Sequence, residues 1–269
     1  MNLKNEYIEK LVDTALIAIK ATNDILMSNW FKFQHIENMD MRYSTKSDLS
    51  PVTKIDFEIE RIIRDIILKN HPTHKIMGEE FKDEGTKNSP YLWTIDPIDG
   101  TKDFIRGLKC FSTLIAVMYD NRVIVGVSNA PALNETIVAF KNGGAFLNNK
   151  KINVSKVNRI QDCFISHGNI NFFKKTKMLA QLTKLCEHTW GNRGFEDFRS
   201  YHLIAAGSID GVLEAKTNIW DIAAVSLIVE EAGGKSTDFK GLPINVDSTS
   251  IVATNGIIHE EILNYFHDK

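Results

Sequence analysis

The stretch YLWTIDPIDGT, residues 91–101, places two aspartates directly after an apolar run. The apolar part is typical of a strand, and Pro97 restricts the backbone between Asp96 and Asp99. Gly100 lets a ligand approach the main chain closely, and the threonine after it supplies a hydroxyl. Two carboxylates held this close repel each other unless a cation lies between them. The stretch therefore predicts a site for a hard divalent metal with oxygen ligands, the kind of site that hydrolyses phosphate esters.

Further acids lie where this strand end could gather them. Gly78-Glu79-Glu80 follows a short strand-like segment, Asp56 lies near the start of a helical pattern, and Asp221 precedes another. Each also has a local explanation: the segment at 96–100 as a type I turn, Glu79-Glu80 as a solvated pair, Asp56 as a first-turn helix acid and Asp221 as a helix cap. These explanations are individually reasonable but jointly strained, since the edge of a sheet would bring all these acids together.

The bulk properties are those of a water-soluble globular protein. The chain has 269 residues, of which 43% are hydrophobic and 25% charged, with a formal net charge of −2. A net charge this close to zero gives no sign of the excess positive charge that binds nucleic acid or a membrane surface. Cys110, Cys163 and Cys186 form no CxxC pair and indicate reduced thiols in a cytoplasmic protein. The polar start predicts no signal peptide, and no apolar run reaches the roughly 20 residues of a membrane span.

The apolar spacing predicts a layered α/β (α+β) architecture instead of a doubly wound nucleotide fold. Helical patterns cover residues 5–30, 53–70, 171–187, 198–207 and 221–232, with a closing helix from 259. Strand patterns cover 75–77, 92–95, 111–118, 123–128, 136–140, 145–147, 152–154, 163–166, 211–214 and 251–254. We expect one continuous domain, 1–269, with two layered halves of about 1–150 and 151–269.

Taken together, the acidic motifs resemble those of the inositol monophosphatase superfamily, which are magnesium-dependent, lithium-sensitive phosphomonoesterases. The resemblance is carried by residues 95–101, Gly78-Glu79-Glu80, Trp220 to Ala224, Glu230 to Gly234, and the stretch KSDLSPVTKID at 46–56. It implies a layered αβαβα sandwich of the inositol monophosphatase and sugar phosphatase type. It also implies a phosphoric monoester hydrolase, a homodimer, and a small phosphorylated alcohol as the partner.

The resemblance further implies a set of metal ligands. Glu79, Asp96 and the Ile98 carbonyl would bind one Mg²⁺; Asp96, Asp99 and Asp221 would bind a second; and Glu79 would reach a weaker third ion. Mn²⁺ is expected to substitute for Mg²⁺. No HExxH or CxxC motif offers a zinc site instead.

Catalytic and substrate-binding roles carry over from the same motifs. The catalytic set would be Asp56 and Thr101, which orient and deprotonate the attacking water, with Glu79. The Gly100 and Thr101 amides would hold the phosphate, and Asp197, Arg199 and Glu214 would contact the alcohol.

The substrate stays open between branches of the superfamily. Trp220 to Ala224 looks like inositol monophosphatases, whereas Gly78 to Phe81, the run from Gly107 to Glu135, and Asp197 look like histidinol-phosphate phosphatases. The sequence therefore ranks inositol monophosphate first and histidinol phosphate second. Two weaker alternatives are a 3′-phosphoadenosine 5′-phosphate phosphatase and a non-catalytic regulatory protein with the same fold. A nucleic-acid binder has no basic stripe to support it.

Overall fold

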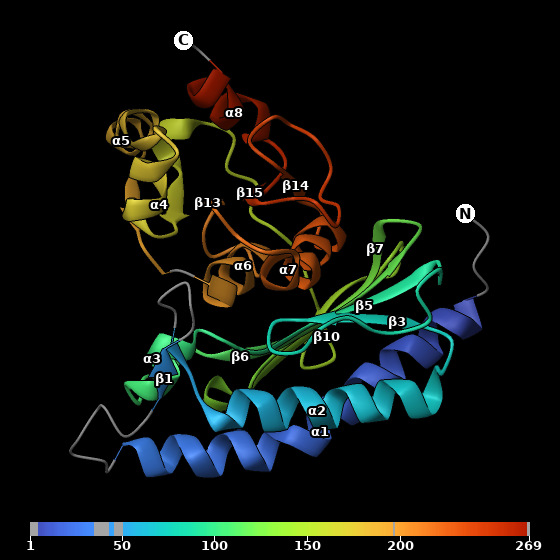
Figure 1. Ribbon diagram of the computed structural model, residues 1–269. Helices are drawn as coiled ribbons and strands as arrows, with labels where there is room; N and C mark the ends of the chain where they lie inside the picture. Colours follow the sequence, from blue (N-terminus) through green and yellow to red (C-terminus); the bar gives the residue numbers. More distant parts are fainter. Residues whose placement is uncertain (1–4, 35–42, 46–50, 196, 268–269) are drawn as a thin grey trace.

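The computed structural model describes residues 5–34, 43–45, 51–195 and 197–267. Its helices and strands are stacked in alternating layers of helix and sheet (Figure 1). The first layer is α1 (Asn5–Phe33) with α2 (Lys54–Asn70), which cover one face of an eight-stranded sheet. On the other face lie α6 (Asp197–Ala205) and α7 (Ile219–Glu231), followed by a five-stranded sheet. The outermost layer holds α4 (Ile170–Lys175), α5 (Leu179–His188) and α8 (His259–His267). The predicted αβαβα sandwich is confirmed.

The eight-stranded sheet carries the stretch that opened the sequence analysis. Its strands are β3 (Lys75–Gly78), β4 (Glu84–Gly85), β5 (Tyr91–Asp99), β6 (Ser112–Tyr119), β7 (Arg122–Ala130), β8 (Glu135–Phe140), β9 (Gly144–Leu147) and β10 (Lys150–Ile152). They lie in the order β10-β9-β8-β7-β6-β5-β3-β4, with β3 and β5 parallel and every other neighbouring pair antiparallel. The antiparallel hairpins predicted after residue 110 are therefore confirmed.

The second sheet is smaller and mixed. Its strands are β11 (Phe164–His167), β12 (Gly191–Arg193), β13 (Gly211–Ala215), β14 (Lys235–Thr237) and β15 (Ser250–Thr254), in the order β12-β11-β13-β15-β14. Short elements complete the described fold: β1 (Ser44–Thr45) paired with β2 (Pro51–Val52), α3 (Thr101–Ile105), and the 3₁₀ turns η2 (Pro131–Leu133) and η3 (Ile160–Asp162). No helix in these described ranges is long and apolar enough to cross a bilayer.

Helix α7 is the central element of the sandwich. It packs against strands of both large sheets, so it must be apolar on both of the faces that contact them. Its residues Ile222 to Val229 are all buried. The run WDIAAVSLIV, residues 220–229, therefore reads as a fully buried helix that begins beside the acid at position 221.

Two parts of the fold differ from the expectations, and one expectation lies outside the described residues. The predicted helix 171–187 is broken into α4 and α5, where Lys177 adopts a left-handed conformation with φ 62°. Strands β12 and β14 are only three residues long and were not predicted. Residues 46–50 of the KSDLSPVT stretch lie outside the described part of the chain, so only its end, from 51, has a described structure.

A buried histidine network joins α1, the end of α2 and the large sheet. The indole N–H of Trp93 donates to Nδ1 of His74 at 2.9 Å, and the His74 Nε2 lies 3.0 Å from the Tyr7 hydroxyl. Because an indole nitrogen can only donate, Nδ1 of His74 must accept, and the neutral ring carries its proton on Nε2. Burial, and then the neighbouring His71, lower the pKa of His74 to about 4.

This network predicts acid sensitivity of the fold. An unfolded histidine titrates near 6.5, whereas the pKa of folded His74 is about 4. As the pH falls from 6.5 towards 4, the unfolded state takes up a proton that the folded state refuses, so stability falls by up to about 1.4 kcal/mol per pH unit from this group. Urea unfolding of wild type and His74→Gln across this range should show a steeper loss in wild type. Parallel curves would contradict the prediction.

Candidate active site

The two aspartates of the opening stretch, Asp96 and Asp99, flank a bulge at the end of strand β5. Pairing of β5 with β6 shifts register between Asp96 and Asp99, and the Pro97 carbonyl accepts from the Thr113 hydroxyl at 2.9 Å. Asp96 is 3% exposed and Asp99 7% exposed. A bulge re-aims side chains that a regular strand would send to opposite faces. The two carboxylates thus belong to the strand itself and not to a solvent-exposed turn after it.

Gly100 and the residue after it shape the exit from this strand. Gly100 has φ 84°, and a Cβ atom there would lie 2.5 Å from the Cys110 carbonyl oxygen. Both the left-handed backbone and the lack of space require glycine. The chain then enters α3, where the Thr101 hydroxyl donates to the Ile98 carbonyl at 2.9 Å.

Asp56 and Asp221 occupy the same position in two different helices. Each is the third residue of its helix, and its carboxylate accepts from the backbone N–H of the cap residue: Thr53 at 2.8 Å for Asp56, and Asn218 at 2.7 Å for Asp221. The local explanation of both acids as helix-start residues is therefore correct. It does not exclude a second role, because these capping bonds hold both carboxylates at helix N-termini near β5.

The structure places the predicted acids close enough for their charges to interact. Burial raises the pKa of Asp96 well above its ordinary value, and the carboxylates of Glu79, Asp99, Asp221 and Asp56 raise it further, in that order. These groups come from β5, the segment after β3, α7 and α2. Acids spread over 166 residues of sequence, from Asp56 to Asp221, thus converge on one strand end.

A second set of acids lies beside Asp99. Burial raises the pKa of Asp99 most, and the Asp197, Asp221 and Glu214 carboxylates add to it, while the N–H of Phe198 donates to Asp99 at 2.7 Å. The same burial, offset in part by Asn218, raises the pKa of Asp221 to about 7. Asp197 and Glu214, predicted from the resemblance as substrate contacts, therefore lie near the predicted metal ligands.

The donor set fits a hard divalent cation. All these groups offer carboxylate or carbonyl oxygens, which Mg²⁺ prefers, and a cation would relieve the repulsion that raises their pKa values. Within the ranges that the structure describes, however, no group of three or more His, Cys, Asp and Glu side chains meets the geometry of a metal site. Binding of an ion would therefore require local adjustment of these side chains.

Arg199 forms its ion pair with a carboxylate outside the predicted site. Its guanidinium donates to Glu135 at 2.7 Å, and Glu135 also lies 2.9 Å from Nδ1 of His202, whose Nε2 lies 2.7 Å from the Ser128 hydroxyl. His202 and Arg199 both lower the pKa of Glu135. The positive charge of Arg199 is thus paired with Glu135, the first residue of β8.

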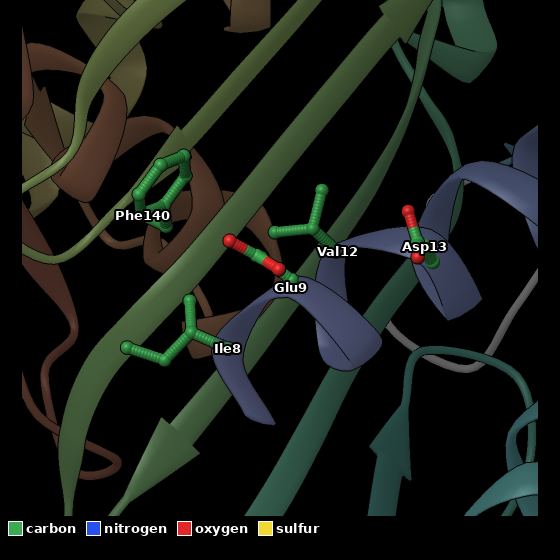
Figure 2. A pocket seen from close by; sticks show the side chains of 5 residues that line it. All are labelled: Ile8, Glu9, Val12, Asp13 and Phe140. Carbon is green, nitrogen blue, oxygen red and sulfur yellow. The ribbon is translucent and has the colours of Figure 1, made fainter. Parts of the chain in front are cut away.

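A shallow pocket elsewhere is not the active site. It has a volume of about 90 Å³ and is lined by Ile8, Glu9, Val12 and Asp13 of α1 with Phe140 of β8 (Figure 2). Sites for small organic ligands measure roughly 300–1,000 Å³. None of the predicted site residues lines this pocket.

Comparison with known proteins supplies the family. The family model described as "Inositol monophosphatase family" matches residues 8–269. The chain belongs to the inositol monophosphatase family. A histidinol-phosphatase of Mycobacterium tuberculosis is 35% identical over 230 residues, covering 84% of this chain and 88% of the relative. A fructose-1,6-bisphosphatase/inositol-1-monophosphatase of Thermotoga maritima is 33% identical over 263 residues, 96% of both chains.

The solved structures agree with this family. The extragenic suppressor protein suhB from Bartonella henselae superposes with a TM-score of 0.87 at 27% identity, covering 96% of this chain and 98% of that one. Membership makes the chain a phosphoric monoester hydrolase of the inositol monophosphatase type, from a family that is generally metal-dependent.

The sequence analysis missed two buried charges next to this site. Glu60 and Arg64 of α2 are both fully buried, one and two turns after Asp56. The signal was present, since Asp56, Glu60 and Arg64 recur every four residues on the helix and therefore share one face.

Proposed function

We propose that this chain is a Mg²⁺-dependent phosphomonoesterase that hydrolyses the monophosphate ester of a small alcohol. The observation that supports it most is the convergence of Asp56, Glu79, Asp96, Asp99 and Asp221 on one strand end. A structural scaffold has no physical need for five mutually repelling carboxylates of which three, those of Asp56, Asp96 and Asp99, are buried. The other four all raise the pKa of Asp96.

The ligand assignment follows the oxygen atoms available. Glu79, Asp96 and the Ile98 carbonyl would hold a first Mg²⁺, Asp96, Asp99 and Asp221 would hold a second, and Glu79 would also reach a weaker third. Mn²⁺ is expected to substitute. When bound, the ions lower the pKa of water and neutralise charge on the phosphate and on the leaving alkoxide.

The chain's own residues position the reactants. Asp56, fixed by its capping bonds to Thr53, would accept the proton of the attacking water, and the Thr101 hydroxyl would orient that water. The amides of Gly100 and Thr101, at the start of α3, hold the phosphate oxygens. In-line attack then depends on positioning and charge neutralisation, without a covalent intermediate.

Two alcohols are proposed as substrates, and histidinol phosphate now comes first. The acids Asp197 and Glu214 both act on Asp99, and the positive charge of Arg199 is already bound by Glu135, so this side of the site suits a substrate with an ammonium group. Inositol monophosphate, which the sequence ranks first, remains the second candidate. It is supported by the Trp220 to Ala224 motif and by the Thermotoga relative, which matches over more of the chain.

A substrate panel separates the two. Released phosphate, measured at pH 8 with Mg²⁺, should give a kcat/KM for histidinol phosphate at least tenfold above that for inositol monophosphate. Asp197→Asn should lower the first value about tenfold, the expected loss of one charged contact, and change the second less than twofold. Equal losses on both substrates would remove Asp197 from substrate recognition. A higher rate on inositol monophosphate would restore the order predicted from sequence.

The remaining proposals concern assembly and location. We propose a single phosphatase domain over 1–269, in which the halves of about 1–150 and 151–269 each carry one of the two large sheets. A homodimer in the cytoplasm follows from the family likeness and from the three thiols. Sedimentation at micromolar concentration tests the dimer.

A further inference from the structure

An ion pair buried behind the Gly78-Glu79-Glu80 motif has no place in the proposed chemistry. Nε of Arg64 donates to Glu60 at 2.8 Å, and both side chains are 0% exposed. Burying two charges costs several kcal/mol each before their attraction offsets it, and apolar replacements are often as stable. Stability alone therefore does not explain why α2 carries this pair at its centre.

The Glu60 carboxylate is bonded to the main chain that follows the motif. It accepts from the N–H of Glu80 at 2.7 Å and from the N–H of Phe81 at 3.2 Å. A Cβ atom at Gly78 would collide with the same carboxylate, so glycine is needed there to admit it. On the other side, the N–H of Glu79 donates to the Ile95 carbonyl of β5 at 3.2 Å. Glu79 is thus held between β5 and Glu60.

Arg64 binds the same segment through its acceptors. Its guanidinium donates to the carbonyls of Phe81 and Lys82, each at 3.2 Å, and to the Glu84 carboxylate at 3.4 Å. It also lies over the Phe81 ring, 5.7 Å from its centroid. The pair therefore supplies hydrogen-bond partners to both the N–H groups and the carbonyls of the backbone from residue 80 to 82. This segment is neither helix nor strand, so no regular secondary structure supplies these partners.

The geometry points to a positioning role: Glu60 and Arg64 fix the segment after β3 so that the Glu79 carboxylate faces Asp96. Asp56, one turn before Glu60, contributes to the site from the same face of α2. Helix α2 thereby positions two acids. Asp56 is part of the helix, and Glu79 is held through the backbone that Glu60 binds. This inference depends on the proposed metal-binding role of Glu79.

The test measures metal affinity as well as turnover. Glu60→Gln keeps the shape and one acceptor but loses the charge that Arg64 and two N–H groups share. We expect it to raise the Mg²⁺ concentration for half-maximal activity, and the calorimetric Kd for Mn²⁺, about 10- to 100-fold, as loss of a group that orients a metal ligand does. The KM for substrate at saturating Mg²⁺ should stay within threefold of wild type.

Two further variants separate positioning from stability. The double variant Glu60→Met/Arg64→Met removes both charges together, so no unpaired charge stays buried. Its unfolding temperature should fall moderately, because the backbone groups of residues 80–82 lose their partners, and the folded variant should show the same loss of metal affinity. Asp65→Asn removes an exposed ion pair with Arg61 on the same helix and should leave metal affinity unchanged. Wild-type Mn²⁺ affinity in either folded variant of the buried pair would overturn the inference.

A measurement on the unmodified protein covers the case in which the variants do not fold. The amides of Glu80 and Phe81 should be protected from hydrogen exchange at least about 100-fold even without metal, because Glu60 already binds them. Free exchange of both amides in the metal-free protein would overturn the inference. If wild type itself bound no metal, the proposed function would fail first, which distinguishes the two failures.

Discussion

Replacing Asp96 by asparagine is expected to lower Mg²⁺-dependent phosphate release by at least about 1,000-fold, the loss of about 4 kcal/mol of transition-state stabilisation. Asp96 is the one carboxylate assigned to both ions, and it lies among Glu79, Asp99, Asp221 and Asp56. The asparagine oxygen can still accept from the Ile98 N–H, which Asp96 does at 3.0 Å, so the backbone of the bulge should be kept. Phosphate release over a range of Mg²⁺ concentrations is the measurement.

The same variant should be more stable than wild type when metal is absent. The substitution removes a buried carboxyl group whose charged form is disfavoured by burial and by four neighbouring carboxylates. The thermal midpoint without metal should therefore rise at pH 8, and added Mg²⁺ should no longer raise it. Asp210→Asn is the matched control. It removes another buried carboxylate, which binds Ser155 and the Phe164 N–H, and should cost stability while leaving the response to Mg²⁺ intact. Full activity in Asp96→Asn would remove Asp96 from the site.

Gly100→Ala is expected to abolish measurable turnover and to destabilise the fold. The added Cβ meets the Cys110 carbonyl oxygen at 2.5 Å, and the backbone at φ 84° costs an alanine roughly 1–2 kcal/mol before that collision is counted. Relief of the collision would move the turn between Asp99 and α3, where a displacement of about 1 Å can cost about 100-fold in rate. Steady-state kinetics and urea unfolding would measure the two effects.

Gly144→Ala separates the collision from the backbone cost. Gly144 also has a positive φ, 95°, but the nearest atom to a Cβ there would be the flexible end of Lys151, at 3.4 Å. All of its neighbours, including the Phe146 ring at 3.8 Å, lie at ordinary contact distances, so this control should lose stability by the backbone cost alone and keep its turnover. Equal loss of turnover in both alanine variants would show that the close approach at Gly100 has no part in the site.

The sequence was a good guide to the acids because each lies at the boundary of an element. Asp96 and Asp99 end an apolar strand, and Asp56 and Asp221 begin amphipathic or fully apolar helices. Such boundaries are visible in the hydrophobic pattern, and in a layered fold they meet at sheet edges. The motifs also identified the family, which then fixed the order of the layers.

Other features depend on contacts that no local pattern encodes. The bulge between Asp96 and Asp99 exists only in the pairing of β5 with β6. The three-residue strands β12 and β14 are too short for an alternating pattern and form because they add to the edges of an existing sheet. Arg199, which the resemblance places with the substrate, donates to Glu135, 64 residues away, a contact that no local pattern predicts.

Calorimetric titration of Mg²⁺ into the metal-free protein at pH 8, with and without inorganic phosphate, tests the central claim most directly. The convergence of five carboxylates on β5 predicts saturable uptake that phosphate strengthens and that Asp96→Asn removes. A wild-type titration without saturable heat under both conditions would contradict the metal site and, with it, the proposed hydrolysis.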